Sequence, residues 1–487
     1  MNQHDLLRDT QETLSDWRAS EKQALELIKL AGDLRFDKGV EVIMFREDVY
    51  NARPSDVINH HQQSEKYIDK VLPVGFTLEI AQIIYNWDRV QPMKLDIGVL
   101  ACDFMESKGE GLEEFVHGRL EKIIVDDRGQ TDHRDVVLYG FGRIGRLLAR
   151  RMISTTGRGD QLRLRAIVLR PKMSNMQEEL EKRAALLVDD SIHGRFAGNV
   201  ELNAEAGTMT VNGNRIHIIF AAQPEEVDYT SYGINDALVI DNTGVWRDKE
   251  GLSRHLRPGA TQVMLTAPGN GVPNIVHGVN QAEAREEGVQ VISAASCTTN
   301  AIVPVIKTVE DAIGIVEGHI ETIHAYTSDQ NLLDNFHKKP RRGRGAATNM
   351  VLTSTGAAKA VAKVLPHLAG KLTGNAVRVP TPDVSIAIMN LTLKKETTIE
   401  EINDLLKEAS LHGPLVEQIY YSTSTEYVSS NAIGMTSTSV VDAPSTLVSV
   451  DGKRVTIYAW YDNEYGYCCQ VVRLAKYFAR VRRPFYY

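Results

Sequence analysis

A cysteine stands where the pattern of the chain changes sharply, within the stretch Val289–Val309, VQVISAASCTTNAIVPVIKTV. The stretch opens as an apolar β-like run and continues as a helical pattern with its apolar residues on one face. Cys297 lies between the two, so its thiol is expected at a helix N-terminus, where the helix dipole and unpaired N–H groups favour the thiolate. The neighbouring Ser296 and Thr298 are capping residue types that also suit an oxygen-binding hollow. The alternative is a buried structural cysteine.

A glycine-rich turn is the second feature that predicts chemistry. The apolar run Asp135–Tyr139 leads directly into Gly140-Phe141-Gly142-Arg143-Ile144-Gly145, and a helical pattern follows. Glycines at this spacing permit a tight turn, close approach of the backbone to a pyrophosphate, and close packing of helix on strand. The helix N-terminus, with Arg143 and Ile144, then binds the phosphates. This arrangement predicts a dinucleotide site, because the motif lies between a strand and a helix.

The end of the next strand bears on which dinucleotide binds. Dinucleotide folds usually place an Asp or Glu there to bind the ribose hydroxyls, whereas this chain has Leu169 followed by Arg170. Without the carboxylate a 2′-phosphate is not repelled, and a guanidinium can pair with it. We therefore expect NADP or dual use rather than strict NAD. Two further strand patterns end near Thr243 and Thr266, which are expected to line the cofactor crevice.

The part of the chain after Cys297 carries anion-binding residue types. A strand pattern delivers His324 to its end, and the basic loop His337–Gly345, HKKPRRGRG, follows. This loop is too short and too poor in aromatic residues for a nucleic-acid surface, so a pocket for phosphate-bearing small molecules suits it better. Thr355 and Gly356 at a helix start, and Arg378 farther on, add further donors of the kind that phosphate prefers. Near the end of the chain, Asn463 is suited to fix a carboxamide and Tyr467 to pack on a flat ring, although ordinary core is the alternative.

Length and composition set the frame for these residues. The 487 residues suffice for two or three domains, and 43% hydrophobic with 24% charged residues describes a globular protein. The net charge of -8 argues against nucleic acid as a partner. Four cysteines are too few for a disulfide framework, the N-terminus lacks the layout of a signal peptide, and no apolar run is long enough to cross a bilayer. We therefore expect a cytoplasmic protein without a membrane partner and without a metal site.

Three regions are expected to position the chemistry. Residues 1–130 show a period near 3.6 and predict an α-helical region, either a docking or oligomerisation module or a regulatory ligand site. The polar stretch Asp126–Asp135 is typical of a linker. Residues 134–296 alternate strand and helix patterns, as in an α/β Rossmann-type dinucleotide-binding domain. Residues 297–463 contain longer strand patterns, which indicate an α+β domain with a mostly antiparallel or mixed sheet.

From about residue 134 onward the sequence resembles phosphorylating glyceraldehyde-3-phosphate dehydrogenases. The motifs are YGFGRIGR at 139–146, ASCTTN at 295–300, HAYTSDQ at 324–330, STGAAKAV at 354–361, RVPTP at 378–382 and WYDNEYGY at 460–467. The chain departs from the family at Leu169, at Asp241-Asn242-Thr243-Gly244 in place of Glu-Ser-Thr-Gly, and in the residues before 134. The resemblance implies a dinucleotide domain and a catalytic domain, a C-terminal helix 464–487 that returns to the former, a homotetramer, and a place in glycolysis or gluconeogenesis.

The resemblance also implies roles for particular residues. Cys297 forms a covalent adduct with the aldehyde of glyceraldehyde 3-phosphate, and His324 stabilises the thiolate as imidazolium or accepts a proton as base. Thr327 and Arg378 bind the phosphate of the substrate. The attacking inorganic phosphate is held by Ser296, Thr298, Arg342, Thr355 and Gly356. The cofactor is held by Gly140, Gly142, Arg143, Ile144, Gly145, Arg170, Thr243, Thr266, Asn463 and Tyr467.

Two other functions compete with this interpretation. An erythrose-4-phosphate dehydrogenase shares the cysteine and the histidine but releases a carboxylic acid, and Thr327 together with the stretch at 354–359 favours the glyceraldehyde 3-phosphate enzyme. A regulatory or scaffold protein on a dehydrogenase body would use the N-terminal region instead. Intact Cys297, His324, Arg342 and Arg378 argue against that loss of catalysis.

Overall fold

The structure is a computed structural model that describes residues 3–107, 111–124 and 133–487. Most of the predicted linker Asp126–Asp135 lies outside the described residues. The chain forms two compact units. The first comprises Met1–Thr131, Gly157–Gly159 and Arg482–Tyr487, and the second comprises Asp132–Thr156 and Asp160–Val481. No helix of the described residues is long and apolar enough to cross a membrane.

The first unit combines the expected helices with a small sheet. The helices are α1 Gln3–Asp33, α2 Pro54–His61, α3 Glu65–Ile68, α4 Val74–Asn86, α5 Ile97–Glu106 and α6 Leu112–Ile124. The sheet has the order β2-β1-β3-β22, formed by Glu47–Asp48, Glu41–Met44, Lys94–Asp96 and Phe485–Tyr486. The helical pattern of the sequence does not predict this sheet. Its last strand comes from the C-terminal end of the chain and runs parallel to β3.

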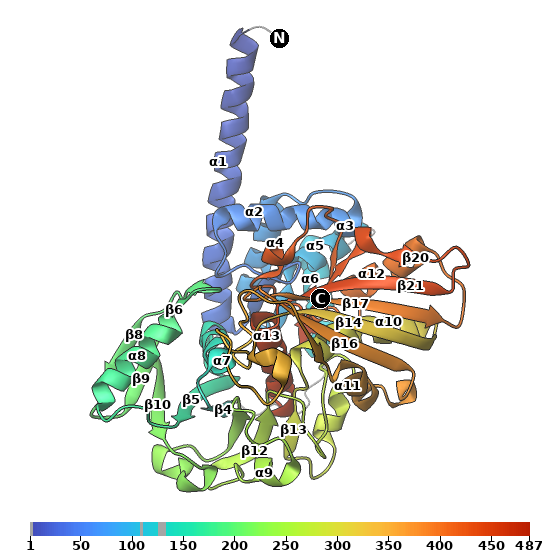
Figure 1. The fold of residues 1–487 in the computed structure, drawn as a ribbon. Coiled ribbons are helices and arrows are strands. Elements are labelled where there is room, and N and C mark those ends of the chain that lie inside the picture. The colour runs from blue at the N-terminus through green and yellow to red at the C-terminus, as the bar shows by residue number, and fades with distance from the viewer. Residues whose placement is uncertain (1–2, 108–110, 125–132) are drawn as a thin grey trace. The chain divides into compact units, whose positions relative to one another are not determined.

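The dinucleotide-type sheet of the second unit has eight strands in the order β13-β12-β11-β4-β5-β10-β9-β8 (Figure 1). The strands are β4 Arg134–Tyr139, β5 Leu162–Leu169, β8 Val200–Asn203, β9 Thr208–Val211, β10 Asn214–Phe220, β11 Ala237–Asp241, β12 Ala260–Leu265 and β13 Val291–Ser293. The pairs from β13 to β10 are parallel, and β9 and β8 add an antiparallel edge. Its helices are α7 Arg143–Ser154, α8 Met176–Val188, α9 Lys249–Ser253 and α13 Tyr465–Phe478. This architecture confirms the predicted Rossmann-type fold.

Both faces of this sheet are covered by other parts of the unit. Alternate residues of a strand point to opposite faces, so neighbouring residues pack in different cores. On β4, Val136 and Leu138 pack in the core that includes α7 and α13, whereas Val137 and Tyr139 pack in a second core on the other face. The C-terminal helix therefore lies against α7, as expected. It is shorter than the predicted 464–487, because it ends at Phe478 and Arg482–Tyr487 belong to the first unit.

The second sheet is mixed, as predicted, with the order β15-β16-β14-β17-β21-β19-β18, and β20 pairs with β21 (Figure 1). The strands are β14 Ile315–Ala325, β15 Val351–Ser354, β16 Leu372–Val379, β17 Ser385–Leu393, β18 Ile419–Ser422, β19 Ser439–Asp442, β20 Leu447–Val448 and β21 Arg454–Tyr461. The helices α10 Cys297–Ala312, α11 Ala357–Val364 and α12 Ile399–Leu411 accompany it, and β6 Asp189–Asp190 pairs with β7 Gly194–Arg195 in a hairpin. Both large sheets belong to one compact unit, so the predicted boundary between residues 296 and 297 stays a prediction.

Candidate active site

The turn before Cys297 is held by hydrogen bonds from three side chains. Ser296 caps α10 by accepting a hydrogen bond from the Thr299 N–H at 3.1 Å. Ala295 has φ +55°, a left-handed conformation that costs energy for a residue with a Cβ. The Tyr467 hydroxyl donates to the Ala295 carbonyl at 2.9 Å, and the Asn300 amide donates to the Ala294 carbonyl at 2.8 Å. These contacts fix the sulfur at the first residue of the helix.

The structure brings Cys297 and His324 together. The Cys297 Sγ lies 3.7 Å from the His324 Nε2, and Cys297 keeps partial exposure to solvent. On the other side of the ring, Nδ1 lies 2.7 Å from the Ala325 carbonyl oxygen. A carbonyl has no proton to donate, so a contact this short requires a proton on Nδ1. The lone pair of Nε2 therefore faces the thiol.

Arg378 completes this group, because β16 pairs with β14 in the register that puts Arg378 beside His324. The Arg378 Nη1 donates to the Ala325 carbonyl at 2.7 Å and lies 3.0 Å from the His324 Nδ1. Because Nδ1 carries a proton, this second distance is a contact between a cation and the ring. The guanidinium is thus adjacent to His324, and its charge also acts on the Cys297 thiol.

Burial sets the protonation of the pair. Burial, with the charge of Arg378 acting in the same direction, lowers the pKa of His324 to about 3. Burial raises the pKa of the Cys297 thiol, against the opposing effect of Arg378 and of the hydrogen bonds from Thr298. The expected thiolate at the helix N-terminus is therefore not favoured, because desolvation is the largest effect on the pKa of this thiol. A neutral thiol facing a neutral imidazole is the form that the site supports.

A second group of hydrogen bonds links this pair to Asn463. The Ala325 N–H donates to the Ser385 hydroxyl at 3.1 Å, and that hydroxyl donates to the Asn463 Oδ1 at 2.7 Å. Thr298 is buried, and its hydroxyl lies 3.0 Å from the Tyr461 hydroxyl. The predicted cofactor and phosphate residues Asn463 and Thr298 thus lie in the same polar network as the histidine.

The remaining predicted phosphate residues lie on two loops of the same sheet. Arg342 forms an ion pair with Asp329 and donates from Nε to the Thr353 hydroxyl at 3.2 Å. Thr327 is partly buried in the turn between the end of β14 and Asp329. The Thr355 hydroxyl accepts a hydrogen bond from the Ala357 N–H at 3.2 Å, just before α11. Gly356 is the N-cap of that helix, without a side-chain cap.

The glycine-rich turn after β4 has the features that a pyrophosphate cradle requires. Gly140 has φ +96°, and a Cβ on Gly145 would lie 2.5 Å from the Gly140 carbonyl oxygen, so both positions need glycine. Gly142 is the N-cap of α7, without a side-chain cap, and a Cβ there would meet no atom within 4 Å. The residues thus fit a dinucleotide, because the first N–H groups of a helix without a side-chain cap, including that of Ile144, have no partner within the helix.

The side chain of Arg143 forms ion pairs within the protein. Its guanidinium donates from Nε to the Glu464 Oε1 at 2.6 Å and from Nη1 to the Asp190 Oδ2 at 3.0 Å. These two carboxylates raise the pKa of Arg143. The backbone N–H of Arg143 at the helix start is therefore its contribution to a phosphate site.

The carboxyl ends of the parallel strands meet at the same edge of the sheet, as predicted. Thr243 donates from its N–H and its hydroxyl to the Asp241 Oδ1, each at 2.7 Å, and the Thr266 hydroxyl donates to the Asp241 carbonyl at 3.1 Å. Arg170 follows β5, is exposed, and has one long hydrogen bond of 3.4 Å to the Ala222 carbonyl. Tyr467 is buried, with 3% of its surface exposed. Its hydroxyl supports the turn before Cys297, whereas the sequence suggested packing on a flat ring of the cofactor.

Comparison with protein families decides which family the second unit belongs to. Residues 134–249 match the family described as glyceraldehyde 3-phosphate dehydrogenase, NAD binding domain. Residues 296–463 match the one described as glyceraldehyde 3-phosphate dehydrogenase, C-terminal domain. The chain belongs to the glyceraldehyde 3-phosphate dehydrogenase family. It is therefore a member of an oxidoreductase family with an NAD(P)-binding domain.

Relatives within the glyceraldehyde 3-phosphate dehydrogenase family fall into two groups. A glyceraldehyde-3-phosphate dehydrogenase-like protein of Pseudomonas aeruginosa is 53% identical over 464 residues, which cover 94% of this chain and 99% of that protein. Glyceraldehyde-3-phosphate dehydrogenase 2 of Trichormus variabilis is 42% identical over 342 residues, covering 70% of this chain and 97% of the relative. The glyceraldehyde-3-phosphate dehydrogenase of Clostridium pasteurianum is 41% identical over 354 residues, covering 72% and 99%. The second group is thus matched almost completely by about seven-tenths of this chain.

Sequence reasoning missed several residues in this dehydrogenase body. Tyr461, Ser385 and Glu464 support the groups described above, and His193, Asp383 and Asp462 form a separate buried group. The motif at 460–467 contains three of these six, so that motif was a usable signal. His193 and Asp383 gave no signal in the sequence, because they lie far apart in the chain and belong to no common motif. Burial and the neighbouring Asp462 raise the pKa of Asp383.

Proposed function

We propose that this chain catalyses the phosphorylating oxidation of glyceraldehyde 3-phosphate, with NAD(P) as hydride acceptor. The observation that carries the proposal is the 3.7 Å contact of the Cys297 sulfur with the His324 Nε2, beside the Arg378 guanidinium. A nucleophile, a base and a fixed cation in one place suit covalent chemistry on a phosphorylated aldehyde. The membership in a family of dehydrogenases supports the same reaction.

The first step uses the neutral pair that the site favours. The Cys297 sulfur attacks the aldehyde carbon, a C–S bond forms, and the thiol proton passes through the His324 Nε2 to the carbonyl oxygen. The backbone N–H of Cys297 stands at the start of α10, where it has no partner within the helix and can stabilise that oxygen. The product is a hemithioacetal on Cys297.

The oxidation turns this adduct into a thioester. When bound, the dinucleotide supplies the acceptor for the hydride of the substrate carbon. The His324 Nε2 takes the hydroxyl proton of the hemithioacetal, which it can do because its Nδ1 proton is engaged by the Ala325 carbonyl. An oxygen of inorganic phosphate then attacks the thioester carbon, the C–S bond breaks, and the sulfur regains its proton from His324. The product is an acyl phosphate.

Two anion sites serve the two phosphates in this proposal. Arg378 and Thr327 bind the phosphate of the substrate, and Ser296, Thr298, Arg342, Thr355 and Gly356 bind the attacking phosphate. The approach of a phosphate dianion to Arg378 offsets the charge that lowers the pKa of His324, so substrate binding makes the imidazole a stronger base. Arg342 would exchange part of its ion pair with Asp329 for contacts to phosphate.

The cofactor preference belongs to the same proposal. We infer NADP use at least comparable to NAD, because Arg170 is exposed at the end of β5, where Leu169 replaces the usual carboxylate. Steady-state kinetics with both dinucleotides measures this preference. A strong preference for NAD would contradict it.

The oligomeric state is a further part of the proposal. We infer that the chain forms a homo-oligomer, because its resemblance to the dehydrogenase family implies a homotetramer. Supporting this, Leu332, Leu333 and Phe336 expose 76%, 78% and 91% of their surface on one loop of the second unit. Light scattering on the purified chain measures its mass in solution, and a monomer at micromolar concentration would contradict this part.

An activity assay tests the function as a whole. Glyceraldehyde 3-phosphate and erythrose 4-phosphate are each supplied with and without inorganic phosphate, and formation of reduced dinucleotide is followed. We expect glyceraldehyde 3-phosphate to be preferred, with turnover that requires phosphate. Preference for erythrose 4-phosphate with release of a free acid would favour the alternative dehydrogenase. No turnover of either sugar would favour a regulatory or scaffold protein.

A further inference from the structure

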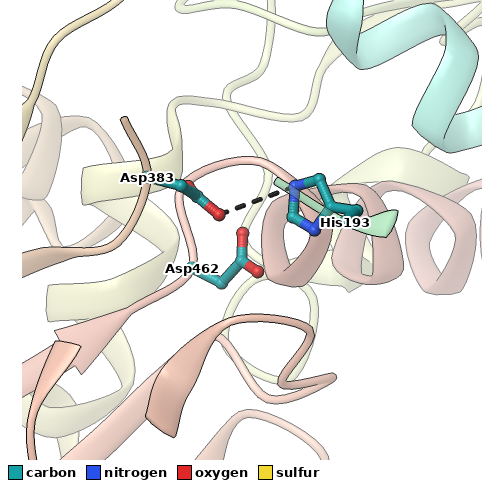
Figure 2. A group of neighbouring side chains, drawn as sticks. All are labelled: His193, Asp383 and Asp462. Carbon is teal, nitrogen blue, oxygen red and sulfur yellow. Dashed lines mark ion pairs between the residues drawn. The ribbon is translucent and has the colours of Figure 1, made fainter. Parts of the chain in front are cut away.

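Three side chains from distant parts of the second unit converge in a buried group that the proposed reaction does not use. His193 lies on the turn between β6 and β7, Asp383 lies between β16 and β17, and Asp462 directly follows β21. Figure 2 shows the three side chains pointing toward one another. One ligand atom from each lies within 4.8 Å of the others. The side chains of His193 and Asp383 expose 5% and 0% of their surface.

Asp383 is the unusual member of this group. Neither of its carboxylate oxygens has a hydrogen-bond partner among the described residues, and its nearest cationic group is the His193 Nε2, at 3.5 Å from Oδ2. Buried polar groups are nearly always hydrogen-bonded, because leaving a carboxylate desolvated and unpaired is costly. A buried carboxylate without a hydrogen bond, directed into a group of potential ligands, therefore points to something that binds there.

Asp462, in the same group, differs from Asp383 because both of its carboxylate oxygens accept hydrogen bonds. Its Oδ1 accepts the N–H groups of Glu464 at 2.9 Å and Tyr465 at 2.6 Å, and its Oδ2 accepts that of Gly434 at 2.8 Å. These bonds fix the direction of the carboxylate. Each oxygen has two lone pairs, so Oδ2 can accept one more partner.

The charges around the group do not balance. Arg143 is engaged by Glu464 and Asp190, two acids against one base. Among the described residues, His193 is the base that forms an ion pair with Asp383, and the His193 Nε2 is shared with Glu464 at 3.2 Å. With both aspartates ionised, even a protonated His193 would leave buried negative charge in excess, and a bound cation would offset that charge.

We propose that His193, Asp383 and Asp462 bind a divalent transition metal ion such as Mn²⁺ or Zn²⁺. One imidazole with carboxylates is a donor set for these ions, because imidazole is uncommon in Mg²⁺ and Ca²⁺ sites. A tetrahedral ion with bonds of about 2.0–2.2 Å separates its ligand atoms by about 3.3–3.6 Å. The 3.5 Å between the His193 Nε2 and the Asp383 Oδ2 matches that separation.

The ion would have a structural role next to the active site. Asp383 precedes Val384, whose φ of +64° is strained for a β-branched residue, and Ser385 comes next. Asp462 precedes Asn463, which accepts the Ser385 hydroxyl at 2.7 Å. An ion bound by both aspartates would therefore fix the two segments that meet in this hydrogen bond. The site is additional to the dehydrogenase chemistry and does not depend on it.

Manganese binding tests the site directly. The full chain is dialysed against EDTA and then titrated with MnCl₂, and free Mn²⁺ is followed by electron paramagnetic resonance. We expect one ion per chain, and Asp383→Asn should weaken binding by about a hundredfold, since it removes a charged ligand while keeping the volume of the side chain. His193→Gln is a second variant, in case Asp383→Asn does not fold. His367→Gln is the control, because His367 pairs with Glu310 at 3.4 Å on the surface and should bind no part of this ion.

Zinc uptake and thermal stability give a second readout. Cysteine thiolates are zinc ligands in general, so this titration uses Cys297→Ser, and bound zinc is measured by mass spectrometry after gel filtration. We expect one equivalent of zinc and a higher melting temperature, and both effects should disappear when Asp383→Asn is added. Absence of metal uptake by the parent chain, or equal uptake by the variants of His193 and Asp383, would overturn the proposal. Dehydrogenase activity enters neither readout, so failure of the proposed reaction would leave this test intact.

Discussion

Each compact unit buries a carboxylate, and the two carboxylates differ in how they are satisfied. In the first unit, Asp96 accepts the N–H groups of Phe45 and Arg46 at 2.8 Å each, and those of Gly98 and Val99 at 3.1 and 3.2 Å. In the second unit, Asp383 accepts none within the described residues. Asp96 therefore caps α5 and ties it to the loop after β1, which is a structural role. Asp383 is left for a partner that the protein itself does not provide.

The same contrast holds for one buried histidine of each unit, His61 and His324. His61 in the first unit has both ring nitrogens engaged, with Nδ1 2.7 Å from the Val57 carbonyl and Nε2 2.7 Å from the Thr77 hydroxyl. His324 has Nδ1 engaged by a carbonyl and Nε2 directed at a thiol. Polar groups that are fully bonded internally stabilise the fold, whereas those with one side left open are suited to chemistry. The comparison thus supports the proposal that the reaction takes place in the second unit, whereas the buried polar groups of the first unit named here stabilise its fold.

The largest effect should come from the cysteine of the second unit. Cys297→Ser is expected to lower dehydrogenase turnover by about three orders of magnitude or more, because the covalent step needs the sulfur. Dinucleotide binding, measured by fluorescence titration, should be unchanged. Cys102→Ala is the matched control, since Cys102 is a free cysteine buried in the first unit, where burial raises its pKa to about 12. Near-normal turnover of the serine variant would end the covalent mechanism.

The two carboxylates should respond oppositely to the same substitution. Asp96→Asn is expected to lower the free energy of unfolding by about 2 kcal/mol or more, because an amide nitrogen replaces an oxygen that accepts a backbone N–H. Burial raises the pKa of Asp96, and its backbone donors oppose that shift, so the substitution acts on these bonds. Asp383→Asn in metal-free buffer should cost less than about 1 kcal/mol or stabilise the protein, since burial and Asp462 already disfavour the charged form of Asp383. Urea unfolding of the full chain measures both, and equal losses would erase the distinction.

The features of the fold and the site that the sequence predicts are those formed by residues close together in the chain. The strand–glycine–helix order at residues 135–150 and the change of pattern at Cys297 are local, so the Rossmann-type sheet and the position of the thiol were predictable. The pairing of β22 with β3 joins residues near 485 to residues near 94, and no local sequence pattern predicts this pairing. The group of His193, Asp383 and Asp462 is scattered in the same way.

The electrostatics of the site were the least predictable feature. The helix N-terminus and a neighbouring histidine suggested a thiolate, and both features are present. Burial instead raises the pKa of Cys297 and lowers the pKa of His324, and both shifts favour the neutral forms. The degree of burial depends on Tyr461, Arg378 and the packing of two sheets. A sequence does not give that quantity.

A smaller effect concerns cofactor choice, which the second unit alone should determine. Arg170→Ala is expected to lower kcat/KM for NADP by about tenfold relative to NAD, the size of one lost charged contact to a phosphate. Lys182→Ala is the control, since Lys182 is an exposed cation on α8 that pairs with Glu178. Steady-state kinetics with both dinucleotides gives the ratio. An unchanged ratio would show that the guanidinium does not reach the 2′-phosphate.

The pH dependence of stability should include a contribution from the first unit. Burial lowers the pKa of His61 to about 4, below the value near 6.5 of an unfolded histidine. The unfolded chain therefore binds a proton first as the pH falls, so the stability due to neutral His61 is present above about pH 6.5 and is lost toward pH 4. His61→Gln should reduce the loss of stability between pH 7 and pH 5 by about 1–2 kcal/mol. Urea unfolding at the two pH values tests this, and an unchanged difference would show that His61 takes up its proton in the folded protein.

The smallest effect on catalysis should come from the largest change, removal of the first unit. Every residue assigned to the reaction lies between Gly140 and Tyr467 in the second unit, and the relatives of Trichormus and Clostridium match about seven-tenths of this chain over nearly their whole length. A chain of residues 132–481 is therefore expected to keep kcat/KM within about threefold, as a compact unit with its own cores can fold alone. A chain of residues 132–487 is the companion variant, because it keeps the β22 residues but removes β3, their partner, and should be more prone to aggregate. A large loss of activity in the shorter chain would show that the first unit contributes to catalysis, and would end the division of roles between the two units.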